Sequence, residues 1–125
     1  MSETDRNRQL AAVAARAASS KQANDVVALD VSGVLSITDL FLIASAPNTR
    51  LVKTVVEEIE KKVKEHLGVG PLHVEGFEDL NWVLLDYGDV VVHVFLEEIR
   101  RYYDLERLWS DVPRLDVAPA AAAPV

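Results

Sequence analysis

Hydrophobic and polar residues alternate most clearly between Trp82 and Phe95, and this pattern predicts a β-hairpin. Gly88 and Asp89 separate two runs rich in β-branched residues, which is typical of a two-residue turn between antiparallel strands. Because side chains alternate between the faces of a strand, pairing Tyr87 with Val90 makes one face wholly apolar and part of the core. The members of that face are Val83, Leu85, Tyr87, Val90, Val92 and Val94.

The other face of this hairpin mixes aromatic, charged and titratable side chains. Its members are Trp82, Leu84, Asp86, Val91, His93 and Phe95. A sheet face of this composition is rarely left bare, so we expect either the segment that follows or another protein to cover it.

Four further segments are predicted before residue 69. An Ala-rich helix is predicted over 5–22, where Leu10, Val13, Ala14 and Ala17 form a thin apolar stripe that we expect to bury only weakly. Apolar strands are predicted over 25–31 and 40–46, the second of a kind found inside a sheet covered on both faces. The clearest helix begins after an N-cap at Asn48 or Thr49 and ends at Gly68.

The remaining segments complete an α/β arrangement. A short strand is predicted over 72–75 and a loop over 76–81, and the apolar spacing over 97–109 predicts one helix, or two with Asp104 capping the second. The expected fold class is a mixed sheet of about five strands flanked by helices, because the hairpin must be antiparallel. We expect the domain to span 1–113 with its core over 25–109, and the Ala/Pro-rich tail 114–125 to be disordered.

Composition narrows the class of protein. At 125 residues, half of them apolar, the chain supports one domain with a proper core. The absence of cysteine excludes disulfides and thiolate chemistry and fits a cytoplasmic location. No apolar run approaches the length of a membrane span. The N-terminal segment is Ala/Ser-rich and basic, but Glu3 and Asp5 argue against a transit peptide, so we interpret it as structural.

Charge is concentrated on the predicted hairpin. Net charge is −7, and the stretch 75–98 holds seven acidic residues and no Lys or Arg, whereas the rest of the chain balances thirteen acids against thirteen bases. Such a surface repels nucleic acid and attracts a basic protein. Acidic residues that simply keep a sheet soluble are an equally good interpretation of the charge alone.

Candidate catalytic and metal-binding residues are sparse. His73 and Glu75 share a strand face, but further ligands are missing, so ordinary surface residues are the better interpretation. His93 lies diagonal to Asp86 and could form half of an acid–base pair, but no nucleophile accompanies it and a structural or interface role is favoured. The glycines do not match a nucleotide-binding loop. We therefore expect no enzyme activity, no metal and no cofactor.

The two tryptophans have different predicted roles. Trp82, on the mixed face with acidic neighbours, is either a partly buried anchor or an interface residue. Trp109, at the end of an apolar stripe, is predicted to belong to the core.

Several motifs resemble the ribosomal silencing factor S family, also called the Iojap family, over roughly 10–113. They are Asp25-Val-Val-Ala-Leu-Asp-Val, Thr38-Asp39-Leu-Phe-Leu-Ile-Ala-Ser, Glu75-Gly76, the hairpin from Trp82 to Phe95, and Arg100-Arg-Tyr-Tyr-Asp-Leu-Glu-Arg-Leu-Trp109. The resemblance implies a fold akin to nucleotidyltransferases without their catalytic residues. It also implies a translational repressor that binds the large ribosomal subunit through ribosomal protein L14, blocks joining of the small subunit, and is dimeric when free. Starvation is the trigger that the family suggests.

Carried over by position, the resemblance implies a protein-binding surface with no direct dependence on nucleic acid or membrane. Its residues would be Trp82, Asp86, Tyr87, Asp89, His93, Arg100, Tyr103 and Glu106. The chain departs from the family pattern before the long helix, where Ala46-Pro47-Asn48 replaces the usual Gly-x-Ser. Two other classes stay open, namely a nucleotidyltransferase-type enzyme and a homodimerisation module whose hairpin face meets itself.

Overall fold

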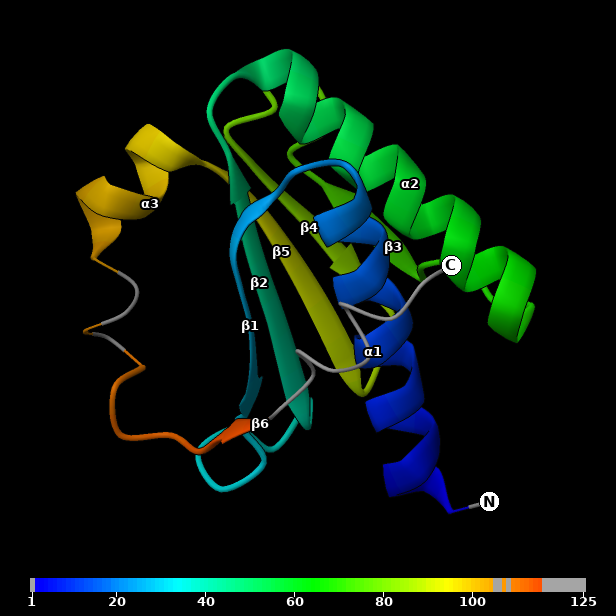
Figure 1. Ribbon diagram of the computed structural model, residues 1–125. Helices are drawn as coiled ribbons and strands as arrows, with labels where there is room; N and C mark the ends of the chain where they lie inside the picture. The colour runs from blue at the N-terminus through cyan, green and yellow to red at the C-terminus, as the bar shows by residue number, and fades with distance from the viewer. Residues whose placement is uncertain (1, 105–106, 108, 116–125) are drawn as a thin grey trace.

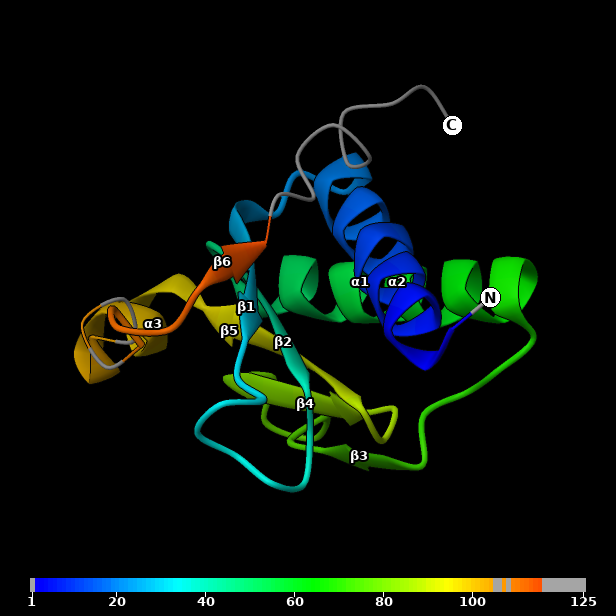
Figure 2. The ribbon, with the colours of Figure 1, turned by 90° about the horizontal axis from the view of Figure 1, so that it is seen from below.

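A mixed six-stranded sheet forms the centre of the computed structural model, which describes residues 2–104, 107 and 109–115. The strands are β1 (Asn24–Asp30), β2 (Leu40–Ala46), β3 (His73–Glu75), β4 (Trp82–Asp86), β5 (Val90–Leu96) and β6 (Arg114–Leu115), and the helices are α1 (Glu3–Ser20), α2 (Thr49–Leu67) and α3 (Glu97–Tyr103). Their order across the sheet is β3-β4-β5-β2-β1-β6, with β2 and β5 parallel and the other neighbours antiparallel. Helices α1 and α2 cover one face and α3 lies on the other (Figures 1 and 2). The predicted α/β class with a mixed sheet is confirmed, with six strands in place of about five.

The hairpin has the predicted register. Leu84 lies opposite His93 and Leu85 opposite Val92, and the backbone N–H of Tyr87 donates to the carbonyl of Val90 at 2.9 Å. Gly88 adopts a positive φ of 92°, the conformation that a tight turn between strands requires. The apolar face predicted from the alternation is the core face, since Val83, Leu85, Val92 and Val94 are fully buried.

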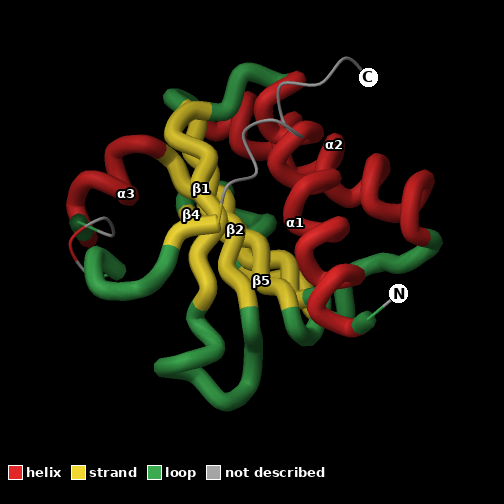
Figure 3. Tube along the Cα trace, turned by 60° about the horizontal axis from the view of Figure 1, so that its bottom comes forward, coloured by secondary structure: helices red, strands yellow, loops and turns green. Residues whose placement is uncertain are grey.

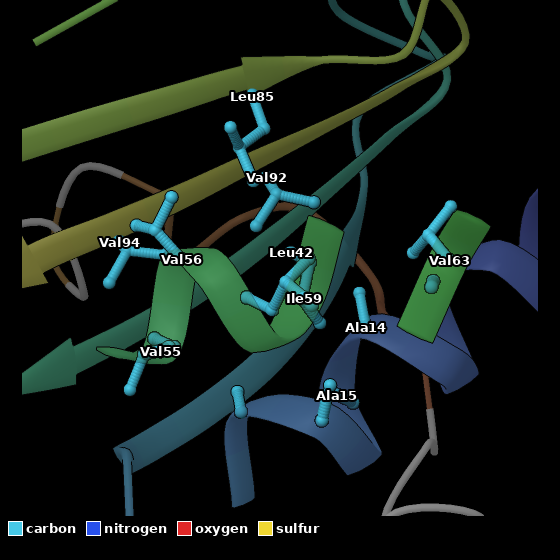
Figure 4. Packing of buried hydrophobic residues seen from close by; sticks show 14 of the residues in the cluster. Ala14, Ala15, Leu42, Val55, Val56, Ile59, Val63, Leu85, Val92 and Val94 are labelled. Atoms are coloured by element: carbon cyan, nitrogen blue, oxygen red, sulfur yellow. The ribbon is translucent and has the colours of Figure 1, made fainter. Parts of the chain in front are cut away.

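The main core lies between the sheet and the two long helices. Strand β2 sits between β1 and β5, which explains why nearly all of its residues are buried. Helix α2 begins as predicted, because the Asn48 side chain accepts from the N–H of Leu51 at 2.9 Å, and Gly68 ends it in the left-handed conformation. Side chains of α2 such as Val56 and Ile59 point toward Leu85 and Val92 of the sheet (Figure 4).

Helix α1 is buried more deeply than the thin stripe predicted. Ser2 caps its first turn by accepting from the N–H of Asp5, and the buried surface includes Ala11, Ala15 and Ala18 beside the predicted positions. Alanines let a helix approach its neighbours closely, so α1 packs against both α2 and the sheet (Figure 3). The expectation of weak burial was wrong because it counted a single stripe, whereas α1 also buries alanines beside that stripe.

The segment after the hairpin crosses the second face of the sheet. Helix α3 ends at Tyr103, where Asp104 takes a left-handed φ of 50°, and Trp109 packs edge-on against Phe41 with ring centroids 5.2 Å apart. In agreement with its predicted core role, Trp109 is partly buried and packs against a second buried cluster that includes Phe95 and Ile43. Arg114 and Leu115 pair with β1 as β6, so the domain extends beyond the predicted limit at 113. The predicted disorder of the rest of the tail concerns residues outside the described part.

Candidate protein-binding site on the hairpin face

Exposed aromatic rings gather where β4 begins and α3 ends. The Trp82 side chain is 40% exposed, and its ring centroid lies 4.7 Å from that of Phe95 and 5.7 Å from that of Tyr103. Tyr103 is about half exposed, and Tyr102, more exposed still, meets it edge-on. We call Trp82, Tyr102 and Tyr103 the aromatic patch. Large exposed aromatic groups that cluster in this way are typical of protein interfaces.

His93 supports this patch from inside. Its side chain is buried, and its Nδ1 accepts the indole N–H of Trp82 at 3.1 Å, which places the imidazole proton on Nε2. Nε2 is buried without a hydrogen-bond partner among the described residues, and the ring lies 4.6 Å from that of Phe41 in a T-shaped contact. Burial lowers the pKa of His93 to about 4, so the imidazole is neutral at physiological pH.

The hypothesis of a His93–Asp86 acid–base pair is wrong. His93 bonds to Trp82, and Asp86 Oδ1 accepts from the N–H of Gly88 at 2.7 Å, which holds the hairpin turn. The Asp89 carbonyl accepts from Thr38 and from the two residues after it, which ties the β1–β2 loop to the same turn. Both carboxylates are partly exposed at the opposite end of β4 from Trp82.

Two of the expected site residues face elsewhere. Tyr87 packs against the main core on the helix side of the sheet, as the alternation predicted, and burial, with a contribution from Glu60, raises its pKa. Arg100 is 5% exposed, and its Nη1 donates to the Asp25 carbonyl at 2.9 Å and to Ser45 Oγ at 3.0 Å. Arg100 therefore anchors α3 to the sheet. Glu106 lies outside the described residues.

The structure thus brings together Trp82, His93 and Tyr103 and places the two aspartates along the same hairpin. Sequence reasoning missed Tyr102, one of the apolar positions that predict a helix over 97–109, and Phe41, which supports His93 from β2. Only the parallel pairing of β2 with β5 reveals the Phe41 contact, because the two residues are about fifty positions apart.

Other kinds of site find little support in the described residues. No group of three or more His, Cys, Asp or Glu side chains among them could hold a metal ion, and His73 and Glu75 are simply exposed on β3. Within the same residues, none of the helices is both long enough and apolar enough to cross a membrane. What the hairpin face offers is an aromatic surface with an acidic surround.

Comparison with known proteins identifies the class. The family model described as "Ribosomal silencing factor during starvation" matches residues 4–124. The chain is 41% identical over 111 residues to the ribosomal silencing factor RsfS of Halalkalibacterium halodurans, covering 89% of this chain and 94% of that protein. It is 32% identical over 93 residues to "mitochondrial assembly of ribosomal large subunit protein 1" of Mus musculus, covering 72% of this chain and 40% of that protein.

A solved structure shares the fold. The crystal structure of a Chromobacterium violaceum protein superposes with a TM-score of 0.78 at 36% identity, covering 94% of this chain and 97% of that one. The chain is an α/β domain whose hairpin face carries exposed aromatic and acidic side chains, a candidate surface for binding another protein. The chain belongs to the ribosomal silencing factor family, whose role is to silence ribosomes.

Proposed function

We propose that this protein represses translation in the cytoplasm by binding the large ribosomal subunit through ribosomal protein L14. The observation that carries the proposal is the aromatic patch, where Trp82 is exposed on a hairpin within the family match. The name of the mouse relative, which refers to assembly of the large ribosomal subunit, supports a partner on that subunit. No bond is made or broken in this mechanism.

Steric exclusion explains how docking would silence a ribosome. The α3 face of the sheet meets the partner, so α1 and α2, on the opposite face, project away from the large subunit (Figure 2). The bulk of the domain then occupies space that the small subunit needs. Depletion of nutrients is the condition under which we expect this block, in line with the starvation role in the family description.

The acidic charge of the hairpin orients the protein as it approaches its partner and raises the association rate constant. The stretch 75–98 carries seven acids and no base, so the hairpin attracts a basic protein surface and repels the phosphate backbone of RNA. A protein contact on the subunit is therefore favoured over a nucleic-acid contact at this face.

Co-sedimentation with purified large subunits tests the proposed surface. We expect Trp82→Ala to reduce binding at least tenfold, because truncation of a central aromatic anchor at an interface costs about 2 kcal/mol or more. Asp86→Asn keeps the oxygen that holds the turn and removes the charge, and we expect a several-fold loss. Glu57→Gln, an exposed acid on α2, is the matched control and should bind normally. Normal binding by both hairpin variants would refute the surface assignment.

The free protein is proposed to pair with itself through the same aromatic patch. An exposed cluster of large aromatic side chains is costly to leave in water, and a second copy would cover it. Sedimentation equilibrium of the free protein should show a dimer that Trp82→Ala weakens and that large subunits dissociate. A dimer that persists on the subunit would place self-association elsewhere.

A further inference from the structure

The exposed part of Trp82 has a definite chemical character. Its indole N–H, the only polar atom of the side chain, is turned inward to Nδ1 of His93 at 3.1 Å. The ring is nevertheless 40% exposed. A partner therefore meets carbon atoms and the π-system of Trp82, and it can gain no hydrogen bond from this side chain.

A second aromatic ring widens this surface. Tyr103, 52% exposed, lies with its centroid 5.7 Å from that of Trp82 at an angle of 55°, and Tyr102 lies edge-on to Tyr103. The exposed part of Trp82 therefore has a second exposed aromatic ring beside it. The faces of Trp and Tyr attract a cation placed within about 6 Å of the ring centroid.

The charges around the patch favour a cation as well. Glu98 lies one helical turn before Tyr102 on α3, and the loop that leads into Trp82 carries Glu78 and Asp79, all three exposed. Arg101 is an exposed base on α3, whereas Arg100 is turned into the sheet. With Asp104, which is also exposed, four acids in these segments compare with two exposed bases, Arg101 and Arg107.

We propose that Trp82 and Tyr103 form a seat for one lysine or arginine side chain of the partner protein, and that His93 sets the orientation of this seat. The proposal rests on the proposed function and specifies the chemistry of its contact. Cation–π contact needs the ring face, and not only apolar bulk, so the identity of residue 82 as an aromatic determines affinity.

His93 acts as a positioning residue and does not itself meet the partner. Its ring is enclosed by those of Trp82, Phe41 and Phe95, and only 8% of the residue is exposed. By accepting the indole N–H it favours this rotation of Trp82, because another orientation would leave the buried Nδ1 acceptor unpaired.

Two substitutions at Trp82 test the seat, each assayed by titrated co-sedimentation with large subunits. Trp82→Phe and Trp82→Leu both remove the bond to His93, but only phenylalanine keeps a π-face. We expect leucine to weaken binding roughly 2- to 30-fold more than phenylalanine, the range of a cation–π contact. Equal affinities of the two variants would show that the contact is merely apolar and would overturn the seat.

The design separates this proposal from the proposed function. If the two variants bind equally but Asp86→Asn and Glu98→Gln weaken binding, the docking surface stands and only the seat fails. If none of these substitutions changes binding, the proposed function itself fails at this face.

A second experiment tests the role of His93. Trp109→Phe makes Trp82 the sole tryptophan, so its fluorescence anisotropy and emission maximum report its orientation. In this background we expect His93→Leu to mobilise the Trp82 ring and to lower the affinity for large subunits to that of Trp82→Leu. His93→Gln keeps a hydrogen-bond acceptor, so it should retain much of the fixed orientation of Trp82 and much of the affinity. Urea unfolding verifies that each variant is folded. Unchanged Trp82 fluorescence, or unchanged affinity with altered fluorescence, would overturn the positioning role.

Discussion

At the scale of single residues, the protein combines an exposed aromatic group with a buried titratable one. Trp82 can hold its ring toward solvent because its polar atom is satisfied inside by His93. The same arrangement confines His93 to its neutral form, since protonation would replace the acceptor with a donor and place a charge in an apolar cluster. Recognition and stability are thus linked through one hydrogen bond.

This link predicts a pH-dependent stability. The pKa of folded His93 is lowered to about 4, below its usual value near 6.5, so the unfolded chain binds the proton more readily. His93 therefore leaves stability intact above pH 6.5, and its contribution to the free energy of unfolding falls by about 3 kcal/mol as the pH drops from 6.5 to 4. Urea unfolding across this range measures the loss.

His93→Gln is the comparison that isolates the effect, because His66 and His73 are exposed and remain in both proteins. The difference in unfolding free energy between wild type and variant should shrink or reverse toward pH 4. A constant difference over the whole range would contradict the burial argument.

At the scale of elements, α3 is a short helix held by one buried arginine. It follows β5 without a loop, and seven residues are too few to form a stable helix alone. The Arg100 guanidinium crosses to the Asp25 carbonyl, at the irregular start of β1, and to Ser45 on β2. This contact fixes α3, and with it Tyr102 and Tyr103, over the end of the hairpin.

Replacing that arginine should loosen the helix. We expect Arg100→Leu to lower the free energy of unfolding by about 1–3 kcal/mol, because it leaves the Asp25 carbonyl and the Ser45 hydroxyl without this donor. Hydrogen exchange in α3 should accelerate. Arg101→Leu, exposed on the same helix, should have little effect on stability. Equal stability of the two variants would rule out an anchoring role.

The loop before β4 contains a position, Gly76, whose backbone conformation and surroundings require glycine. Gly76 has a φ of 81°, and a Cβ added there would collide with the backbone carbonyl of Trp82. Gly76→Ala should therefore displace the start of β4, lower the free energy of unfolding by about 1–3 kcal/mol, and weaken binding to large subunits. Gly33→Ala, where a Cβ meets open space, is the matched control in urea unfolding. Equal stability of both variants would contradict the geometry.

At the scale of the whole molecule, one face of the sheet holds most of the core and the other carries the proposed binding surface. The long helices bury most of the core on one side, so the larger share of the apolar burial lies away from the face that meets the partner. The α3 side of the sheet (Figure 1) has a smaller apolar cluster, and the aromatic patch on that side is exposed. The acidic excess lies along the hairpin and its flanks.

This charge distribution predicts a salt-sensitive association. The rate constant for binding to large subunits should fall about tenfold or more between low and high ionic strength, while the dissociation rate changes less. Stopped-flow fluorescence measures both. Neutralising Glu98 should reduce the salt dependence, and neutralising Glu57 on α2 should not. Association that is insensitive to salt would remove the steering role.

The sequence by itself determined the hairpin register, the α2 caps and the central position of β2. Those features depend on local periodicity and on single residues such as Asn48 and Gly68. The tertiary structure alone decided the strand order, the addition of β6, the depth to which α1 is buried, and the partners of His93 and Arg100. Most of these features depend on residues far apart in the chain, such as Arg100 with Asp25 and Ser45, or His93 with Phe41. Alternation placed Trp82 and His93 on one face of the hairpin, but it did not predict the hydrogen bond between them. The composition of the hairpin face indicated an interface, but only the packing of α3 decided that Trp82 stays exposed while His93 is enclosed.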